Sequence, residues 1–240
     1  MTNTDPALID DLVAANRILY NEGVVDGFGH VSGRHDKDPE RFLLVRSMAP
    51  GLVTAADLME FDLAGDPIDP QGRTPYLERF IHSEIYKAYP AVQAVVHSHS
   101  PAVIPFGVVA APLRPIFHMG SFLGLGVPVF EIRGAGGPAT DMLIRTPALG
   151  EALAKSLGSA AVALLRGHGN VVIGASVKEV VFRAVYTEVN ARLQSEALRL
   201  GQGQVVFLND AEAMASMTTN QGQITRSWEL WKAKALATGD

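Results

Sequence analysis

Residues 91–103, AVQAVVHSHSPAV, constrain the fold of this chain more than any other segment. Their apolar run predicts a buried strand, and His97 and His99 stand at its end. Because side chains alternate across a strand, these two histidines point to the same face and can aim two nitrogens at one point. Neutral imidazole is the commonest protein ligand for zinc and similar ions. An isolated pair of this kind is also explained by two half-buried histidines that bond to nearby carbonyls, so the rest of the chain must decide.

The composition bounds the core and excludes some classes of protein. The 240 residues, 48% hydrophobic and 19% charged, suffice for a sizeable core, and we expect a single domain over residues 1–240. No uncharged apolar stretch is long enough to cross a bilayer, and the N-terminus MTNTDPALIDD is acidic where a signal peptide is basic. We therefore expect a cytoplasmic protein without a membrane partner. A net charge of −5 without a basic stripe argues against nucleic acid as a partner.

The helices and strands are predicted from periodicity and from turn residues. A capping residue before Pro6 predicts a helix that runs to Gly23. Thr74 followed by Pro75 predicts the start of a second helix, which ends before Pro90. The other predicted elements are strands at 41–46, 58–63, 160–165 and 170–173 and a long helix at 176–200. Strands mixed with helices at irregular spacing favour an α/β fold whose sheet is mostly antiparallel.

One carboxylate and three histidines form the candidate site: Glu78, His97, His99 and His168. Glu78 lies on the predicted helix that leads into the strand of His97 and His99, and His168 lies between two glycines in a turn between apolar strands. Since the chain has no cysteine, a metal must be held by nitrogen and oxygen, and this set suits a divalent ion such as zinc, manganese or iron. Glu78 could instead pair with His82 on a solvated helix face, and His168 could be a turn residue with unusual dihedral angles.

Four motifs follow one another along the chain: GFGHVSGR at 27–34, PYLERFIHSEIY at 75–86, AVVHSHSPAV at 94–103 and LLRGHGNVVIG at 164–174. In this order they resemble the class II aldolase and adducin family, which includes fuculose phosphate aldolase and ribulose phosphate epimerase. The resemblance extends over roughly residues 7 to 230. It implies three layers, a central antiparallel sheet with helices on both sides, and a C4 homotetramer with active sites between neighbouring subunits.

The same resemblance implies roles for the four candidate residues. His97, His99 and His168 match the family's metal-binding histidines. Glu78 matches its acidic residue, a metal ligand that can also act in proton transfer. The implied cofactor is one divalent ion, zinc or manganese, with iron or cobalt as further possibilities.

The sequence departs from the sugar phosphate members of the family at the positions that hold the substrate phosphate. The family's GNxS, Thr-Gly and Ser-Ser become here Gly29-His30-Val31-Ser32, Pro50-Gly51 and Tyr76-Leu77. Pro50 has no backbone donor, and Leu77 has no side chain that could hydrogen-bond. Each charge-assisted bond that is lost costs about 1.5 to 3 kcal/mol. We therefore expect a substrate other than a sugar phosphate.

Histidine in place of the family's asparagine, the YLERFIHSEIY helix and IPFG after the HSHSP strand resemble the family's decarboxylases of hydroxylated aromatic and pyridine dicarboxylates. This implies a metal-dependent carbon–carbon lyase, in which the metal stabilises the forming oxyanion and a general acid protonates the ring carbon. Glu78 and His30 are the candidate acids. We expect His30 in a flexible loop after Gly29, where it could instead bind a substrate carboxylate or be an ordinary surface residue.

Five further residues are candidates for binding a small aromatic carboxylate: Ser32, Arg34, Arg46, Tyr76 and His118. Either arginine could anchor a carboxylate by bidentate bonds or form an ordinary surface ion pair. Tyr76 would offer apolar surface, and His118 could reach the pocket or be a packed structural histidine. Residues 133–137, RGAGG, lack the lysine and serine of a P-loop and are predicted to form a plain loop.

Two other functions remain open at this point. One is an aldolase or epimerase that acts on a small hydroxycarbonyl compound. The other is a non-enzymatic scaffold, because the adducin branch of the family keeps the fold without the chemistry. The presence of Glu78 and all three histidines argues against the scaffold.

Overall fold

Eight strands form one sheet in the order β4-β3-β2-β1-β5-β8-β7-β6 in the computed structural model, which describes residues 4–237. The strands are β1 His30–Arg34, β2 Arg41–Val45, β3 Leu58–Asp62, β4 Pro67–Ile68, β5 Ala94–Ser98, β6 Val129–Phe130, β7 Val162–Leu165 and β8 Gly169–Gly174. Neighbouring strands run antiparallel, apart from β6 and β7, which are parallel. The predicted mostly antiparallel sheet is confirmed.

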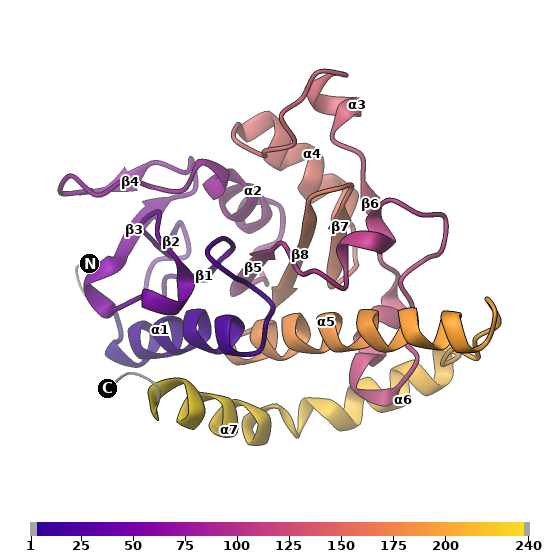
Figure 1. Ribbon diagram of the computed structural model, residues 1–240. Coiled ribbons are helices and arrows are strands. Elements are labelled where there is room, and N and C mark those ends of the chain that lie inside the picture. The colour runs from indigo at the N-terminus through magenta and orange to yellow at the C-terminus, as the bar shows by residue number, and fades with distance from the viewer. Residues whose placement is uncertain (1–3, 238–240) are drawn as a thin grey trace.

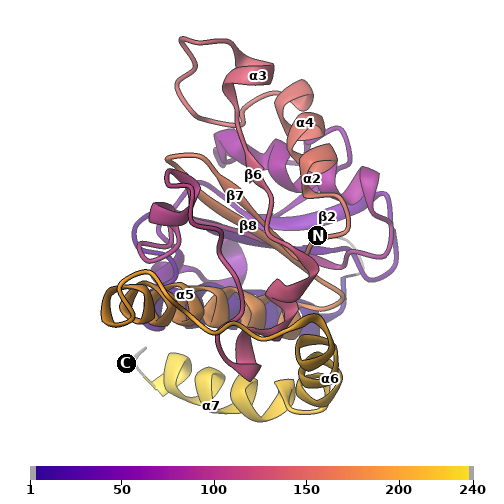
Figure 2. The same cartoon turned by 90° about the vertical axis from the view of Figure 1, so that its right-hand side faces the viewer.

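Helices cover both faces of the sheet, which gives the three predicted layers (Figures 1 and 2). The helices are α1 Pro6–Asn21, α2 Phe80–Ala88, α3 Arg133–Gly136, α4 Pro147–Leu157, α5 Val177–Leu200, α6 Asp210–Gln221 and α7 Ile224–Ala237. Short 3-10 helices span Pro50–Leu52, Ala55–Asp57, Leu77–Arg79, Ile104–Gly107 and His118–Leu125. In Figure 1, α1, α5 and α7 lie below the sheet and α2 and α4 lie above it. None of the helices within residues 4–237 is long and apolar enough to cross a membrane.

Each face of the sheet has its own hydrophobic core. Because side chains alternate along a strand, the consecutive residues Val95 and Val96 belong to different clusters. Val96 packs in the cluster that includes Leu12 of α1 and Val180 of α5. Val95 packs in the cluster that includes Ile85 of α2. His97 is two residues beyond Val95, so it points to the face covered by α2.

Most of the predicted helix and strand positions are confirmed, but the second helix begins later than predicted. Asp5 caps α1 by accepting from the backbone nitrogen of Ala7, and Ser176 caps α5 in the same way. After Pro75 the chain stays extended at Tyr76 and then forms the 3-10 turn Leu77–Arg79, so α2 starts only at Phe80. The prediction of one helix from Pro75 is therefore wrong. Glu78 lies in the turn that precedes α2.

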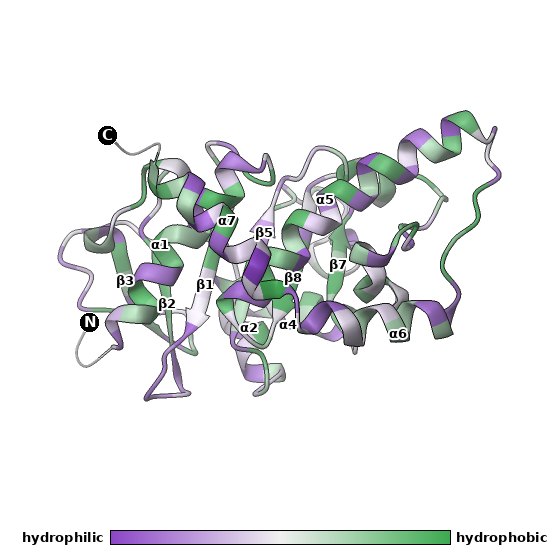
Figure 3. Ribbon diagram, turned by 90° about the horizontal axis from the view of Figure 1, so that it is seen from below, coloured by the Kyte–Doolittle hydropathy of each residue, from purple (hydrophilic) through white to green (hydrophobic). Residues whose placement is uncertain are grey.

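The prediction that His30 lies in a flexible loop is also wrong, because His30 begins strand β1. The segment HVSGR has only one aliphatic side chain, and β1 is largely pale in Figure 3, whereas β7 is green. The strand is nevertheless buried at all five positions, because β2 and β5 pair with it on either side. Gly29 precedes it with φ +95°, and a Cβ there would lie 2.6 Å from Cγ1 of Val25. Only glycine enters this strand without strain.

Residues 133–137 were predicted to be a plain loop, and this is wrong, because Arg133–Gly136 form the single helical turn α3. Helices α4, α6 and α7 and the short strands β4 and β6 were not predicted either. The two strands have only two residues each, which is too short for a period of two to be visible.

Strands β1, β5 and β8 lie side by side in the middle of the sheet. His30 of β1 stands opposite His97 of β5, and Ser98 of β5 stands opposite Asn170 of β8. Gly169 lets β8 approach closely, since a Cβ there would lie 2.0 Å from the carbonyl oxygen of Ser98. The C-terminal end of β5 and the β7–β8 turn therefore lie next to each other, at one end of these central strands.

Candidate metal centre

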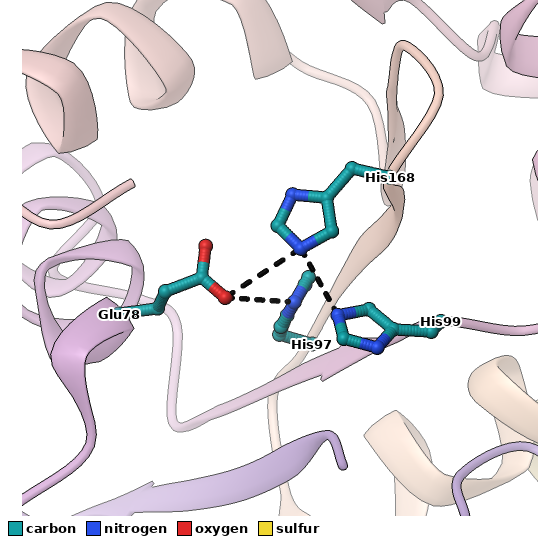
Figure 4. A group of neighbouring side chains, drawn as sticks. All are labelled: Glu78, His97, His99 and His168. Atoms are coloured by element: carbon teal, nitrogen blue, oxygen red, sulfur yellow. Dashed lines mark hydrogen bonds and ion pairs between the residues drawn. The ribbon is translucent and has the colours of Figure 1, made fainter. Parts of the chain in front are cut away.

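The structure brings the four predicted ligands together above the middle of the sheet (Figure 4). Glu78, His97, His99 and His168 each offer one ligand atom, and these atoms lie within 4.8 Å of one another. One carboxylate oxygen of Glu78, Oε2, lies 3.5 Å from Nε2 of His97 and 3.5 Å from Nε2 of His168. The four side chains come from three separate parts of the fold: the turn before α2, the end of β5 and the β7–β8 turn.

His97 is oriented by the neighbouring strand. Its Nδ1 lies 3.1 Å from the carbonyl oxygen of Asn170, so Nδ1 carries the proton and donates it to that carbonyl. Nε2 is then unprotonated and faces the cluster. This atom is fully buried and has no hydrogen-bond partner among the described residues. A buried acceptor without a partner costs free energy, and a metal ion at this point removes that cost.

Glu78 is held as an anion on the other side of the cluster. Its Oε1 accepts a hydrogen bond of 2.9 Å from the backbone nitrogen of Ile144, which leaves Oε2 directed at the imidazoles. Burial raises the pKa of Glu78, but the nearby imidazoles of His97 and His168 outweigh this effect and lower the pKa well below its usual range. The alternative in which Glu78 pairs with His82 on a solvated helix face is wrong, because both side chains are buried.

His99 and His168 face each other across the cluster. Their Nε2 atoms lie 3.0 Å apart, so one of the two must carry a proton or both must bind a cation. Burial, together with His97 and His168, lowers the pKa of His99 to about 4, which keeps this ring neutral at neutral pH. Three imidazoles and a carboxylate at these distances fit a divalent metal ion.

The cluster opens into a cavity of about 590 Å³, a volume typical of small-molecule sites. The cavity is lined by residues of four connecting segments, the start of β1 and the end of β5: Gly27, Phe28, Gly29, His30, Ser47, Met48, Ala49, Tyr76, Leu77, Glu78, His97, His99 and Leu143. No lysine or arginine is among these lining residues. Phe28 and Leu77 are 69% and 59% exposed, so apolar side chains surround the entrance.

His30 and Tyr76 form one wall of this cavity. Their ring centroids are 4.5 Å apart. The hydroxyl of Tyr76 donates to the carbonyl oxygen of Met48, so it is not a free donor to a bound molecule. Ser32 does not reach the cavity, because its side chain is fully buried behind His30. The prediction that Ser32 contacts the substrate is therefore wrong.

Arg34 has a structural position and does not line the cavity. Its guanidinium is buried, with 6% of the residue exposed, and donates to the backbone carbonyls of Val92, Pro39, Tyr86 and Tyr89. Both predicted roles of Arg34, a substrate anchor and a surface ion pair, are wrong. Arg34 thus links the end of β1 to the end of α2 by hydrogen bonds to the carbonyls of Tyr86 and Tyr89.

Replacing Arg34 with methionine should therefore affect stability and leave substrate binding unchanged. The change leaves buried carbonyls without donors, and we expect a loss of about 2 kcal/mol or more in the free energy of unfolding. Urea denaturation of both proteins measures it. A large rise in KM with unchanged stability would contradict this assignment and return Arg34 to the substrate site.

The two remaining predicted residues lie outside the cavity. Arg46 pairs with Asp57, with 2.7 Å between Nε and Oδ1, which confirms the surface ion pair that was its alternative role. His118 begins the 3-10 helix His118–Leu125, and its side chain is exposed. His118 does not line the cavity of its own chain, and it is not a packed structural histidine.

Residues 10–195 match the family described as class II aldolase and adducin N-terminal domain. Decarboxylase tropJ of Talaromyces stipitatus is 37% identical over 240 aligned positions, which cover 91% of this chain and 90% of that protein. A 3,4-dihydroxyphthalate decarboxylase of a Terrabacter species is 34% identical over 201 positions, covering 79% of this chain and 81% of the relative.

A solved structure supports the fold. The crystal structure of an aldolase II superfamily protein from Pseudomonas syringae superposes with a TM-score of 0.80 at 24% sequence identity, and the match covers 99% of this chain and 96% of that one. At this level of identity the likeness concerns the arrangement of the sheet and helices.

Proposed function

Because the chain belongs to the class II aldolase and adducin family, we propose that it is a metal-dependent decarboxylase of a hydroxylated aromatic dicarboxylate. The observation that carries the proposal is a cluster of one glutamate and three histidines at the base of a cavity with apolar walls. Relatives at 37% and 34% identity that are named as decarboxylases support it.

Glu78, His97, His99 and His168 would hold one divalent ion, for which zinc and manganese are the first candidates and iron and cobalt the next. A bound ion would act as a Lewis acid that stabilises negative charge on the substrate oxygen beside the bond that breaks. The chain offers only nitrogen and oxygen donors, which all four of these ions accept.

The cavity suits a flat ring better than a phosphorylated sugar. Phe28, Leu77 and Leu143 contribute apolar surface, and the Tyr76 ring stands beside His30. A phosphate needs several donors of hydrogen bonds, and arginine or lysine commonly supplies them. The lining side chains that can donate are few, and the Tyr76 hydroxyl is already bonded to Met48.

Loss of one carboxyl group requires a proton at the ring carbon that carries it. The proton adds to this carbon, the bond to the carboxylate breaks, and its electron pair restores the aromatic ring as carbon dioxide leaves. We assign the proton transfer to His30, which lines the cavity 5.1 Å from His97 between ring centroids. Glu78 is less suited, because its Oε1 accepts from the backbone nitrogen of Ile144 and its Oε2 faces the imidazoles.

The proposal includes the assembly of the protein. A homotetramer with sites at subunit interfaces would cover exposed apolar side chains at the cavity entrance, among them Phe28 and Leu77.

The alternative function of an aldolase or epimerase would use the same cluster of Glu78 and three histidines and would differ in the groups that hold the substrate. A scaffold without activity would not need the buried Nε2 of His97, which has no hydrogen-bond partner within residues 4–237.

A panel of substrates tests the proposal. We expect carbon dioxide release from at least one hydroxylated benzene or pyridine dicarboxylate, with dihydroxyphthalates tested first, and no cleavage or epimerisation of fuculose or ribulose phosphates. Hydroxybenzoates should inhibit competitively, because their rings fit the same apolar walls. Retro-aldol cleavage of a sugar phosphate without decarboxylation of any dicarboxylate would assign the protein to the aldolases.

A further inference from the structure

Four buried side chains form one hydrogen-bonded chain that leads from the cavity into the core. Nδ1 of His30 lies 2.6 Å from Nε2 of His82, Nδ1 of His82 lies 2.7 Å from Oγ of Ser32, and this Oγ lies 2.8 Å from the hydroxyl of Tyr86. All four residues are buried, and only His30 lines the cavity.

The residue spacing on strand β1 and on helix α2 brings these four side chains into one row of hydrogen bonds. His30 and Ser32 are two apart on β1 and share the face of the sheet covered by α2. His82 and Tyr86 are four apart on α2 and so share one face of that helix. The two pairs interlock, with the His82 ring between His30 and Ser32.

The hydrogen-bond donors can be arranged along this chain in two directions. In the first, Tyr86 donates to Ser32, Ser32 donates to Nδ1 of His82, and Nε2 of His82 donates to Nδ1 of His30. In the second, every bond is reversed, and the Tyr86 hydroxyl becomes the acceptor at the inner end.

The two directions differ at Tyr86. Its hydroxyl has no partner other than Ser32 within residues 4–237. In the second direction its hydrogen is therefore buried without an acceptor, which is unfavourable, whereas the first direction leaves no donor of the chain unused inside the protein. Burial lowers the pKa of His82 to about 3 and raises that of Tyr86, so the His82 ring and the hydroxyl are both neutral at neutral pH.

We infer that the Tyr86–Ser32–His82 chain fixes the tautomer of His30, with Nδ1 as acceptor and Nε2–H as the donor available to a molecule in the cavity. His82 is on this account a positioning residue that acts through His30. A donor in this place can hydrogen-bond to a substrate carboxylate and hold the ring in position. The catalytic consequence rests on the proposed function, whereas the tautomer itself does not.

Neutron diffraction tests the tautomer directly and needs no substrate. Crystals of the full chain, loaded with zinc at neutral pH, should show a hydrogen on Nε2 of His30 and on Nε2 of His82, and none on Nδ1 of His30. A hydrogen on Nδ1 of His30 would overturn the inference. Because this measurement is independent of turnover, it decides the tautomer even if no dicarboxylate is decarboxylated.

A pair of variants tests the catalytic consequence. His82→Leu and His82→Gln have side chains of similar volume, but only glutamine can donate to Nδ1 of His30. We expect kcat to fall about 100-fold or more in His82→Leu and to recover to within about tenfold of wild type in His82→Gln, with KM changing less than kcat. Tyr86→Phe should fold and lower kcat by about 3-fold to 10-fold, because the inner donor is lost. Equal kcat values in the leucine and glutamine variants would show that His82 only fills space.

Discussion

Replacing His97 or His99 with alanine is expected to remove most of the bound metal and nearly all of the activity. Each histidine supplies one of four ligand atoms that lie within 4.8 Å of one another. Loss of one ligand weakens the site, and in the double variant only Glu78 and His168 remain. Elemental analysis of the purified proteins and a carbon dioxide assay measure the two effects.

His118→Ala is the matched control, because His118 is exposed and does not line the cavity. It should keep wild-type metal content, because it is not one of the four clustered ligands. Thermal unfolding followed by circular dichroism separates loss of metal from loss of fold. Full metal occupancy in the His97→Ala, His99→Ala double variant would contradict the ligand assignment.

Glu78→Gln should lower activity by about 100-fold while the fold survives, because the candidate metal site loses its anionic ligand. Glutamine keeps the size of the side chain and an oxygen that can accept from the backbone of Ile144, so the loop is retained. What is lost is the negative charge beside His97 and His168. Glu151→Gln, a change of an exposed carboxylate on α4, is the control. Turnover near that of wild type with intact metal would remove Glu78 from the chemistry.

The metal ligands could be predicted from the sequence because their motif order resembles a known family and because alternation places His97 and His99 on one face. Helix α1 was predictable since its cap and periodicity are local. Strand β1 was not, because its polar residues are buried by β2 and β5, and such tertiary pairing leaves no local pattern.

The wrong predictions for Arg34 and Ser32 have the same cause, since tertiary contacts that leave no local sequence pattern determine the burial of both residues. A charged side chain in a sequence is most often exposed, yet Arg34 is buried because four backbone carbonyls accept its hydrogen atoms. Ser32 shares a face with His30, so only the position of α2 decides which of the two reaches the cavity. His30 and Ser32 are two apart on a strand, and His82 and Tyr86 are four apart on a helix. These two spacings were the sequence pattern from which the buried row of hydrogen bonds could have been predicted.

Carbon dioxide release from one hydroxylated aromatic dicarboxylate, measured as a function of metal content per chain, tests the central claim most directly. Protein stripped with a chelator should release almost none. Addition of zinc or manganese should restore the rate in proportion to bound metal, with a plateau at about one ion per chain, as expected for a single cluster of four ligands. Undiminished release from fully stripped protein, or a plateau reached without occupancy of this site, would contradict the account.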